Sequence, residues 1–234
     1  MENKNKYVSF VSDEDFLECV SYVCSAYTEN AKNVLDPIKA LFDVLNRGLT
    51  VETWNNDEEK RLRDKKVNNR IGEFHQRLLG KVEGWEDLGR GHPTKLDLKK
   101  TDGSIYIELK NKFNTLNSGG ESTLRKNLEK VLDDHPKAKI CYAYIISENG
   151  DSGKEVWVYK GKENKNILKI WGKDVYELVT GNPNAINELW KALPLAIKDC
   201  INCNVTISKK DNKKLNKYFK EGFYCLSGQQ KLVK

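Results

Sequence analysis

Apolar residues recur at helical spacing through the first third of the chain. In residues 13–47 they lie three and four positions apart, within DEDFLECVSYVCSAY and again within PIKALFDVL. Pro37 directly after Asp36 is typical of the first turn of a helix. Residues 58–82 carry a similar pattern, basic at its start and amphipathic at its end. The pattern predicts helices in both regions.

The repeat shortens to two in the middle of the chain. Residues 95–99 and 104–110 alternate between apolar and polar side chains, and Asp102-Gly103 between them favours a tight hairpin turn. Further strands are expected at 140–147 (ICYAYIIS) and 155–160, and further helices at 121–133, 172–180 and 184–192. Hairpins combined with one helical crossover predict an α/β fold with a mixed sheet.

The hairpin register follows from counting outwards from the turn. With Asp102 and Gly103 as the loop, Lys99 lies opposite Tyr106 and Asp97 lies opposite Glu108. Lys110 shares the face of Glu108, two residues further along the strand. The opposite face is expected to point to the core, and it carries five aliphatic residues: Leu96, Leu98, Ile105, Ile107 and Leu109.

Two opposed carboxylates are an unusual feature of a strand pair. Their Cβ atoms are expected roughly 5 Å apart, where like charges destabilise a sheet. A divalent cation between Asp97 and Glu108 reverses that effect, and hard oxygen ligands suit magnesium. The alternative interpretation is an exposed hairpin face with solvated charges. The spacing of Asp97, Glu108 and Lys110 by itself favours this alternative, because charged residues are common in this chain.

The composition is that of a folded protein with a heavily charged surface. Of the residues, 38% are hydrophobic and 32% charged. A chain of 234 residues is long enough for one well-buried core, or at most two small ones. Lys and Arg gather in residues 60–70, 95–112 and 209–220, a distribution that fits binding to a phosphate backbone or a solvated lysine-rich surface. No run is apolar over the roughly 18 residues of a membrane span, and the first residues lack the apolar region of a secretory signal. A cytoplasmic protein without membrane contact is expected.

Six cysteines raise the question of disulfides or zinc. Cys200 and Cys203 form one C-x-x-C pair, but no second pair follows at zinc-finger spacing. Reduced thiols are therefore expected.

Longer segments around the hairpin carry a family resemblance. Asp97 followed by Glu108-Leu109-Lys110 resembles the PD-(D/E)XK nuclease signature, although Pro93 precedes Asp97 by four residues instead of one. Four segments resemble type II restriction endonucleases of the group that recognises GGNCC: IGEFHQRLLG (71–80), GRGHPTKLDLKK (89–100), IELKNKFNT (107–115) and WGKDVYELVTGNPNAINELW (171–190). The resemblance covers about residues 65–195, and neither the N-terminal helices nor the tail after residue 200.

The resemblance implies a PD-(D/E)XK restriction-endonuclease-like fold, with a central mixed β-sheet flanked by helices. We expect a single domain over residues 1–234, with an N-terminal helical region to about residue 60 and a basic C-terminal extension from about residue 200. The implied activity is Mg²⁺-dependent hydrolysis of phosphodiester bonds in double-stranded DNA at a short palindromic site, in restriction-modification defence. A homodimer, and a DNA methyltransferase that protects host DNA, are implied as partners.

The same resemblance assigns Asp97, Glu108 and Lys110 as catalytic residues, with the two carboxylates holding the metal. A helix residue often joins such metal sites, and family habit favours Glu73 whereas the helical wheel favours His75. Each also suits an ordinary position, His75 in a core and Glu73 in solvent. Candidate DNA contacts lie in the GRGH loop, after the catalytic strand and on the next helix: Arg90, His92, Asn111, Lys112, Asn114 and Arg125.

Two other functions stay open at this point. Another PD-(D/E)XK enzyme, of DNA repair or junction resolution, has the same three residues, although no helicase motif accompanies them here. A non-catalytic DNA-binding module that keeps the fold is the second alternative, and it has no need of a metal-binding trio.

Overall fold

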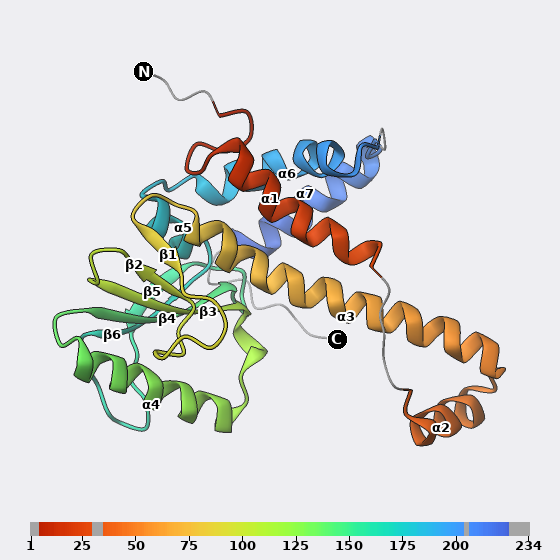
Figure 1. Cartoon of the computed structure of the whole chain (residues 1–234), viewed down its shortest axis with the longest axis horizontal. Helices are drawn as coiled ribbons and strands as arrows, with labels where there is room; N and C mark the ends of the chain where they lie inside the picture. The colour runs from red at the N-terminus through yellow and green to blue at the C-terminus, as the bar shows by residue number, and fades with distance from the viewer. Residues whose placement is uncertain (1–4, 30–34, 204–205, 225–234) are drawn as a thin grey trace.

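A six-stranded mixed sheet lies at the centre of the computed structural model, which describes residues 5–29, 35–203 and 206–224 (Figure 1). Its strand order is β1-β2-β3-β4-β6-β5. The antiparallel part consists of β1 (Trp85–Asp87), β2 (Leu98–Lys100) and β3 (Ile105–Lys112). β3, β4 (Lys139–Ile146) and β6 (Ile167–Trp171) run parallel, and β5 (Gly153–Val156) is antiparallel to β6. The predicted α/β fold with a mixed sheet is confirmed.

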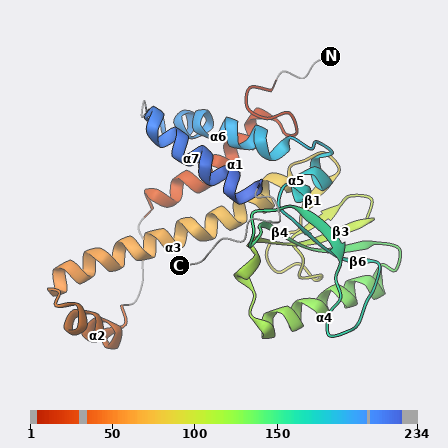
Figure 2. The same cartoon turned by 180° about the vertical axis from the view of Figure 1, so that it is seen from behind.

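Helices cover both faces of this sheet (Figures 1 and 2). α4 (Ser118–Asp134) is the predicted crossover between β3 and β4, and it covers one face. α3 (Val51–Gly80) and α5 (Lys173–Thr180) cover the other face, where α1 (Asp13–Cys24) and α6 (Ala185–Ile201) pack behind them. No helix in the described ranges is both long and apolar enough to span a membrane.

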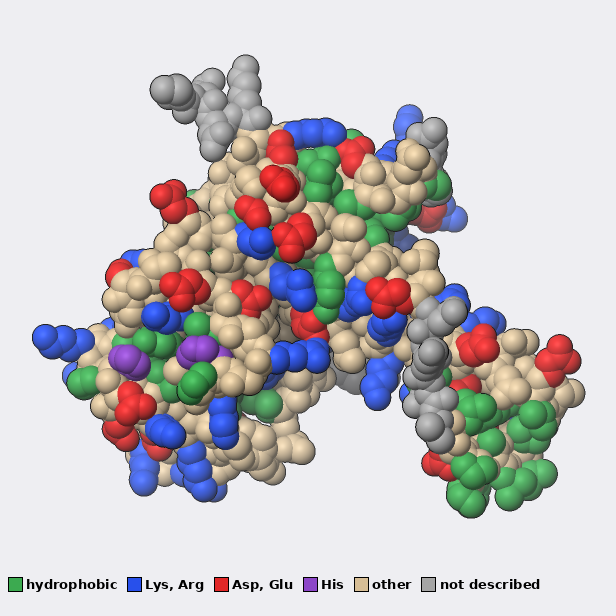
Figure 3. All heavy atoms as spheres, in the orientation of Figure 1, with side chains coloured by type: hydrophobic (Ala, Val, Ile, Leu, Met, Phe, Trp, Pro, Cys, Tyr) green, Lys and Arg blue, Asp and Glu red, His purple; other side chains and the backbone are tan. Residues whose placement is uncertain are grey.

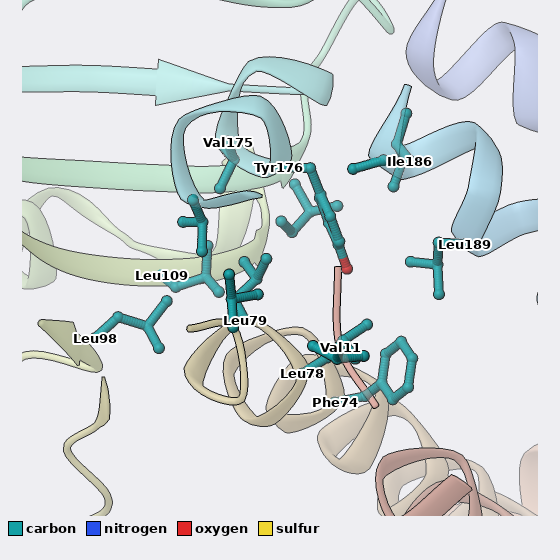
Figure 4. Close-up of a cluster of buried hydrophobic side chains, with 14 of the residues drawn as sticks. Val11, Phe74, Leu78, Leu79, Leu98, Leu109, Val175, Tyr176, Ile186 and Leu189 are labelled. Atoms are coloured by element: carbon teal, nitrogen blue, oxygen red, sulfur yellow. The ribbon is translucent and has the colours of Figure 1, made fainter. Parts of the chain in front are cut away.

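Strand alternation divides the core between these two faces. Leu98 and Leu109 point towards α3 and α5, where Leu78, Leu79 and Tyr176 enclose them (Figure 4). Strand residues that point to the opposite face, such as Tyr106 of β3 and Tyr142 of β4, belong to a second cluster beneath α4. The charged positions of β3 lie on this second face, since they alternate with Ile107 and Leu109.

The helical region predicted over 13–47 is confirmed and contains two α-helices. α1 ends at Cys24 and a 3-10 turn, η1 (Ser25–Tyr27), follows it. α2 (Pro37–Arg47) then starts afresh because Asp36 caps it: its carboxylate accepts hydrogen bonds from the backbone N–H groups of Ile38 and Lys39, at 2.9 and 3.2 Å. The first-turn proline is confirmed.

Other boundaries also differ from expectation. α3 begins at Val51, not residue 58, because the Thr50 hydroxyl accepts a hydrogen bond from Thr53 N at 3.1 Å and caps the helix. α6 continues through Pro194 as far as Ile201, because its buried face extends to Ala196. β1 and β6 were not predicted. The basic segment after residue 200 contains a helix, α7 (Lys209–Phe223), which lies beside α6 (Figure 2). Phe219 of α7 stacks on Trp190 of α6.

Candidate active site

The β2–β3 hairpin holds the residues with candidate chemistry. Lys99 pairs with Tyr106 and Leu98 with Ile107, so the predicted register is confirmed. The turn itself differs from the expected two-residue type, because of the two central positions only Gly103 has a positive φ, 71°. Instead, the Asp102 carboxylate accepts a hydrogen bond from Ser104 N at 2.9 Å, which closes a wider loop.

The chain bends immediately before β2. Lys95 has a positive φ of 56°, and Asp97 precedes the first strand residue, although its N–H still donates to the Ile107 carbonyl at 3.0 Å. As a consequence Leu96 is buried beneath α4 and not beside Leu98. The expectation that Leu96 shares the Leu98 face is therefore wrong, since period-two alternation fails where the strand bends.

Asp97, Glu108 and Lys110 come together on the hairpin as the register requires. Asp97 Oδ2 accepts a hydrogen bond from the backbone N–H of Leu109 at 2.7 Å and lies 3.7 Å from Lys110 Nζ. Lys110 Nζ also donates to Glu108 Oε1. The side chains are only 22%, 13% and 23% exposed respectively, which places three charged groups in a largely desolvated space.

One acceptor in this group has no partner. Glu108 Oε2 is buried and receives no hydrogen bond from the described residues. A buried carboxylate oxygen without a donor is costly, so a native structure that keeps one usually uses it.

Burial and mutual repulsion perturb all three groups. Burial first, then the charge of Asp97, raises the pKa of Glu108 to about 7. Burial likewise raises the pKa of Asp97, against the lowering effect of Lys110 and of the Leu109 N–H. Burial alone lowers the pKa of Lys110, but the neighbouring carboxylates of Glu108 and Asp97 outweigh it and raise that pKa above its ordinary value. The pair of carboxylates therefore holds negative charge at a cost, which a cation would offset.

An open cleft leads to Asp97 and Lys110. One wall is α3, from Asn68 to Gln76, and the floor is formed by Asp97, Leu109 and Lys110. The segment that follows Lys110, residues 111–115, forms another wall of the cleft and includes the 3-10 turn η2 (Phe113–Thr115). The structure thus brings the C-terminal end of β3 against the C-terminal part of the long helix.

The two alternative helix residues point in different directions. Glu73 lines the cleft, where its carboxylate accepts from the Tyr22 hydroxyl and from the Arg90 guanidinium. The Nδ1 atom of His75 lies 2.6 Å from the Tyr176 hydroxyl, on the side where α3 packs against α5. Burial lowers the pKa of His75 to about 4, so its imidazole is neutral at physiological pH. Of the two, only Glu73 faces the candidate site.

The proposed DNA-contacting residues separate into three groups. Arg90, Asn111, Lys112 and Asn114 all line the cleft, and the Arg90 side chain is 88% exposed. His92 turns back on its own loop, with Nδ1 2.8 Å from Thr94 Oγ1.

Arg125 does not fit the expectation of a DNA contact. It is 3% exposed, donates to Glu129 at 2.9 Å and to the Trp157 carbonyl oxygen, and its guanidinium lies over the Trp157 ring. That expectation is corrected here: Arg125 supports the packing of α4, because its helical position faces the core and not the cleft.

Several residues in the cleft or in the pocket beside it carried no sequence signal. Asp87 on the three-residue strand β1 accepts hydrogen bonds from Gln76 Nε2 at 2.7 Å and from Gly89 N at 2.8 Å, and its charge adds to the rise in the pKa of Asp97. Gln76 and Asn69 lie on the cleft face of α3 with Glu73, at helical spacing. No motif or repeat in the sequence marks these residues, and only the fold brings them together.

The cysteine pair near residue 200 lies outside this site. Cys200 Sγ is partly buried and 3.7 Å from the Leu17 carbonyl oxygen, and both Cys200 and Cys203 are free. Cys225 lies outside the described residues. Within the described ranges no three His, Cys, Asp or Glu side chains gather in a metal-binding cluster.

Comparison with known proteins identifies the family of this chain. Residues 8–202 match the family described as Eco47II restriction endonuclease. The chain is 34% identical to the type II restriction enzyme Eco47II of Escherichia coli over 82% of this chain and 87% of that protein. It is 29% identical to the type II restriction enzyme Sau96I of Staphylococcus aureus over 84% of this chain and 82% of that protein. The match extends well beyond the hairpin, to most of the helices that surround it, and on that extent the chain belongs to the Eco47II restriction endonuclease family and is a type II restriction endonuclease.

Proposed function

We propose that Asp97, Glu108 and Lys110 form the catalytic centre of this restriction enzyme. The observation that carries the proposal is the unpartnered, buried Oε2 of Glu108 beside a second partly buried carboxylate. Such a pair is unfavourable alone and favourable around a cation. The resolvase and DNA-binding-module alternatives have no comparable support, because the family match is to restriction enzymes.

Type II restriction endonucleases generally require a divalent metal ion. The residues present fit this requirement, since Asp97 and Glu108 offer hard carboxylate oxygens and one of these has no partner among the residues that the structure describes. We propose magnesium as the ion, with Glu73 and not His75 as the additional residue on the helix side. When bound, a metal of this type neutralises negative charge on a phosphate and lowers the pKa of a water molecule.

Lys110 supplies a fixed positive charge in the proposed mechanism. Its raised pKa keeps the ammonium protonated between two carboxylates, which favours stabilising negative charge on the phosphate over accepting a proton. Its N–H donors also orient a water molecule on the same side of the sheet. The Leu109 N–H restrains Asp97 in place, so that the floor of the cleft is preorganised before DNA binds.

DNA binding is proposed along the cleft between α3 and residues 111–115. Lys112 and Arg90 supply positive charge, and Asn111 and Asn114 supply amides able to donate and accept hydrogen bonds at base edges or phosphates. We propose that these four side chains contact DNA and that Arg125, which is buried, does not. Double-stranded DNA at a short palindromic site, GGNCC, is the proposed substrate.

A palindrome presents two equivalent half-sites, so we propose a homodimer with one catalytic centre for each strand. A DNA methyltransferase acting on the same sequence is proposed as the functional partner, because unmodified host sites would otherwise be cut. The whole chain is proposed to act as a single domain, since one sheet carries both core clusters.

Plasmid cleavage tests this proposal. With Mg²⁺, a plasmid that contains a few GGNCC sites should give discrete fragments, and sequencing the ends should place every cut at such a site. A matched plasmid without GGNCC should stay intact. Random degradation, or cutting at another sequence, would contradict the proposed specificity, and no cutting by a folded protein would contradict the proposed centre.

A further inference from the structure

Helix α2 presents its apolar side to solvent. Ile38, Leu41, Phe42 and Leu45 are 64%, 57%, 65% and 72% exposed, and they follow one another at three- and four-residue spacing along one face. The same side chains form the apolar patch at the end of the projecting arm in Figure 3. No residue of α2 is buried.

The polar side of α2 is the side that packs against the protein. Lys39 Nζ lies 3.1 Å from Glu58 Oε2, and the Trp54 indole N–H donates to Asp43 Oδ2 at 2.9 Å. Arg47 pairs with Asp57 at 2.8 Å. An amphipathic helix normally packs through its apolar face, whereas α2 packs against the rest of its chain through its polar face. This orientation leaves the apolar face free for another surface.

The arm that carries α2 projects from the rest of the fold (Figure 1). α3 is about 45 Å long at the helical rise of 1.5 Å for each residue. Its C-terminal part packs on the sheet and lines the catalytic cleft, whereas between Glu58 and Val67 none of its residues is buried. Whatever binds α2 is therefore connected to the cleft through one continuous helix.

The geometry points to a second copy of this chain as the occupant of the α2 face, meeting it through an antiparallel α2–α2 contact. This inference rests on the proposed homodimer and names the surface where the two copies meet. The area is suitable: four side chains of this size present on the order of 500 Å² of apolar surface. A standard interface buries about 800 Å² on each partner, of which roughly 60% is apolar.

The pattern of the face is also self-complementary. The four apolar positions are spaced symmetrically about the midpoint between Leu41 and Phe42, so an antiparallel copy sets Ile38 opposite Leu45 and Leu41 opposite Phe42. The antiparallel arrangement also sets the N-terminal end of each α2 beside the C-terminal end of the other, where the helix dipoles attract. A parallel arrangement would instead bring like ends of the two dipoles together.

The test is the mass of the full chain in solution, measured by sedimentation. Wild type should be a dimer. Leu45→Asp should raise the dimer dissociation constant by at least about a hundredfold, because the carboxylate would lose its hydration in the α2–α2 contact. Val158→Asp is the matched control: this aliphatic residue is 55% exposed and lies outside the arm, so the variant should remain a dimer. Unchanged circular dichroism of Leu45→Asp excludes misfolding as the cause.

Orientation is tested by mixing two variants that are each monomeric alone, Ile38→Lys and Leu45→Asp. In the antiparallel contact the introduced lysine faces the introduced aspartate while the native pair is kept on the other side, so the mixture should dimerise. Persistent monomers in the mixture would overturn the antiparallel pairing. A dimeric Leu45→Asp would overturn the α2 interface and leave the homodimer standing, whereas a wild type that is monomeric with and without DNA would overturn both. Site-specific cleavage by wild type separates either result from failure of the proposed activity.

Discussion

In the β2–β3 hairpin three charged side chains are largely removed from water, whereas in α2 four large apolar side chains face it. Both arrangements are unfavourable for the chain alone, because buried charges lose hydration and exposed apolar surface orders water. The proposed partners, a cation at the hairpin and a second apolar surface at α2, would each offset that cost. We interpret both local departures from the usual burial pattern as signs of a binding partner whose kind follows from the chemistry of the departure.

The largest effect is expected from removing a carboxylate at the hairpin. Asp97→Ala or Glu108→Ala should lower single-turnover cleavage by at least about a thousandfold, roughly 4 kcal/mol in the barrier, because each carboxylate serves the metal. DNA binding and dimer mass should be unchanged, since α2 is untouched. Glu86→Ala, on the neighbouring strand and half exposed, is the matched control and should cut normally. Normal cutting by either hairpin variant would remove it from the proposed centre.

Lys110→Arg should cleave DNA much more slowly than wild type, although the substitution keeps the positive charge. Guanidinium is planar and bulky, and it would pair with both oxygens of Glu108 and draw that carboxylate from the metal. We expect at least a hundredfold loss in single-turnover rate, about 2.7 kcal/mol, with site-specific binding within a few-fold of wild type. Lys99→Arg controls for the exchange in the same hairpin. A near wild-type rate would mean that Lys110 contributes charge alone, and Lys112 or Lys95 would be examined next.

The cost of the buried carboxylates should be visible as a pH dependence of stability without metal. Because the pKa of Glu108 is raised to about 7 in the folded protein, the folded state keeps a proton that the unfolded chain has already released above its ordinary pKa of 4.5. The free energy of unfolding therefore falls as pH rises through this window and stays reduced above it. Glu108→Gln should remove that fall and be more stable than wild type at pH 8 by about 1–3 kcal/mol, with no gain near pH 4.5.

Urea unfolding in EDTA at a series of pH values measures this difference. Glu86→Gln should follow the wild-type curve, since its side chain is about half exposed. If the free energy of unfolding varied with pH in the same way for wild type and Glu108→Gln, burial of the Glu108 carboxylate would not destabilise the metal-free protein.

The smallest expected effect concerns phosphate contacts along the cleft. Specific binding measured in the absence of Mg²⁺ should weaken steeply with salt, with a log–log slope of about −5 for six phosphate contacts. Lys112→Gln should reduce that slope by about 0.9, because one fewer counterion is released. Lys165→Gln, an exposed lysine beyond the opposite ends of the strands, should leave it unchanged. Equal slopes for all three proteins would exclude Lys112 from the DNA interface.

Local periodicity was sufficient for the elements that carry the chemistry. Period-two alternation on both sides of Asp102-Gly103 determined the strand register, even though the turn has a different conformation, because a one-residue slip would have turned Leu98 and Ile107 to the polar face. Glu108 and Lys110 follow directly from that register. Short elements without a periodic repeat, such as β1 with three residues, could not be predicted in this way, and Asp87 was missed with it.

The sequence by itself therefore determined the α/β class, the register of the hairpin and the meeting of Asp97, Glu108 and Lys110, since all three depend on spacing along neighbouring strands. Only the tertiary structure decided which way the helices face. It turned Glu73 into the cleft and His75 towards Tyr176, it buried Arg125 against Trp157, and it docked α2 by its polar side. A helical repeat shows that the two faces of a helix differ. Which face packs against the protein depends on contacts with residues far along the chain, and such contacts leave no pattern in the local sequence.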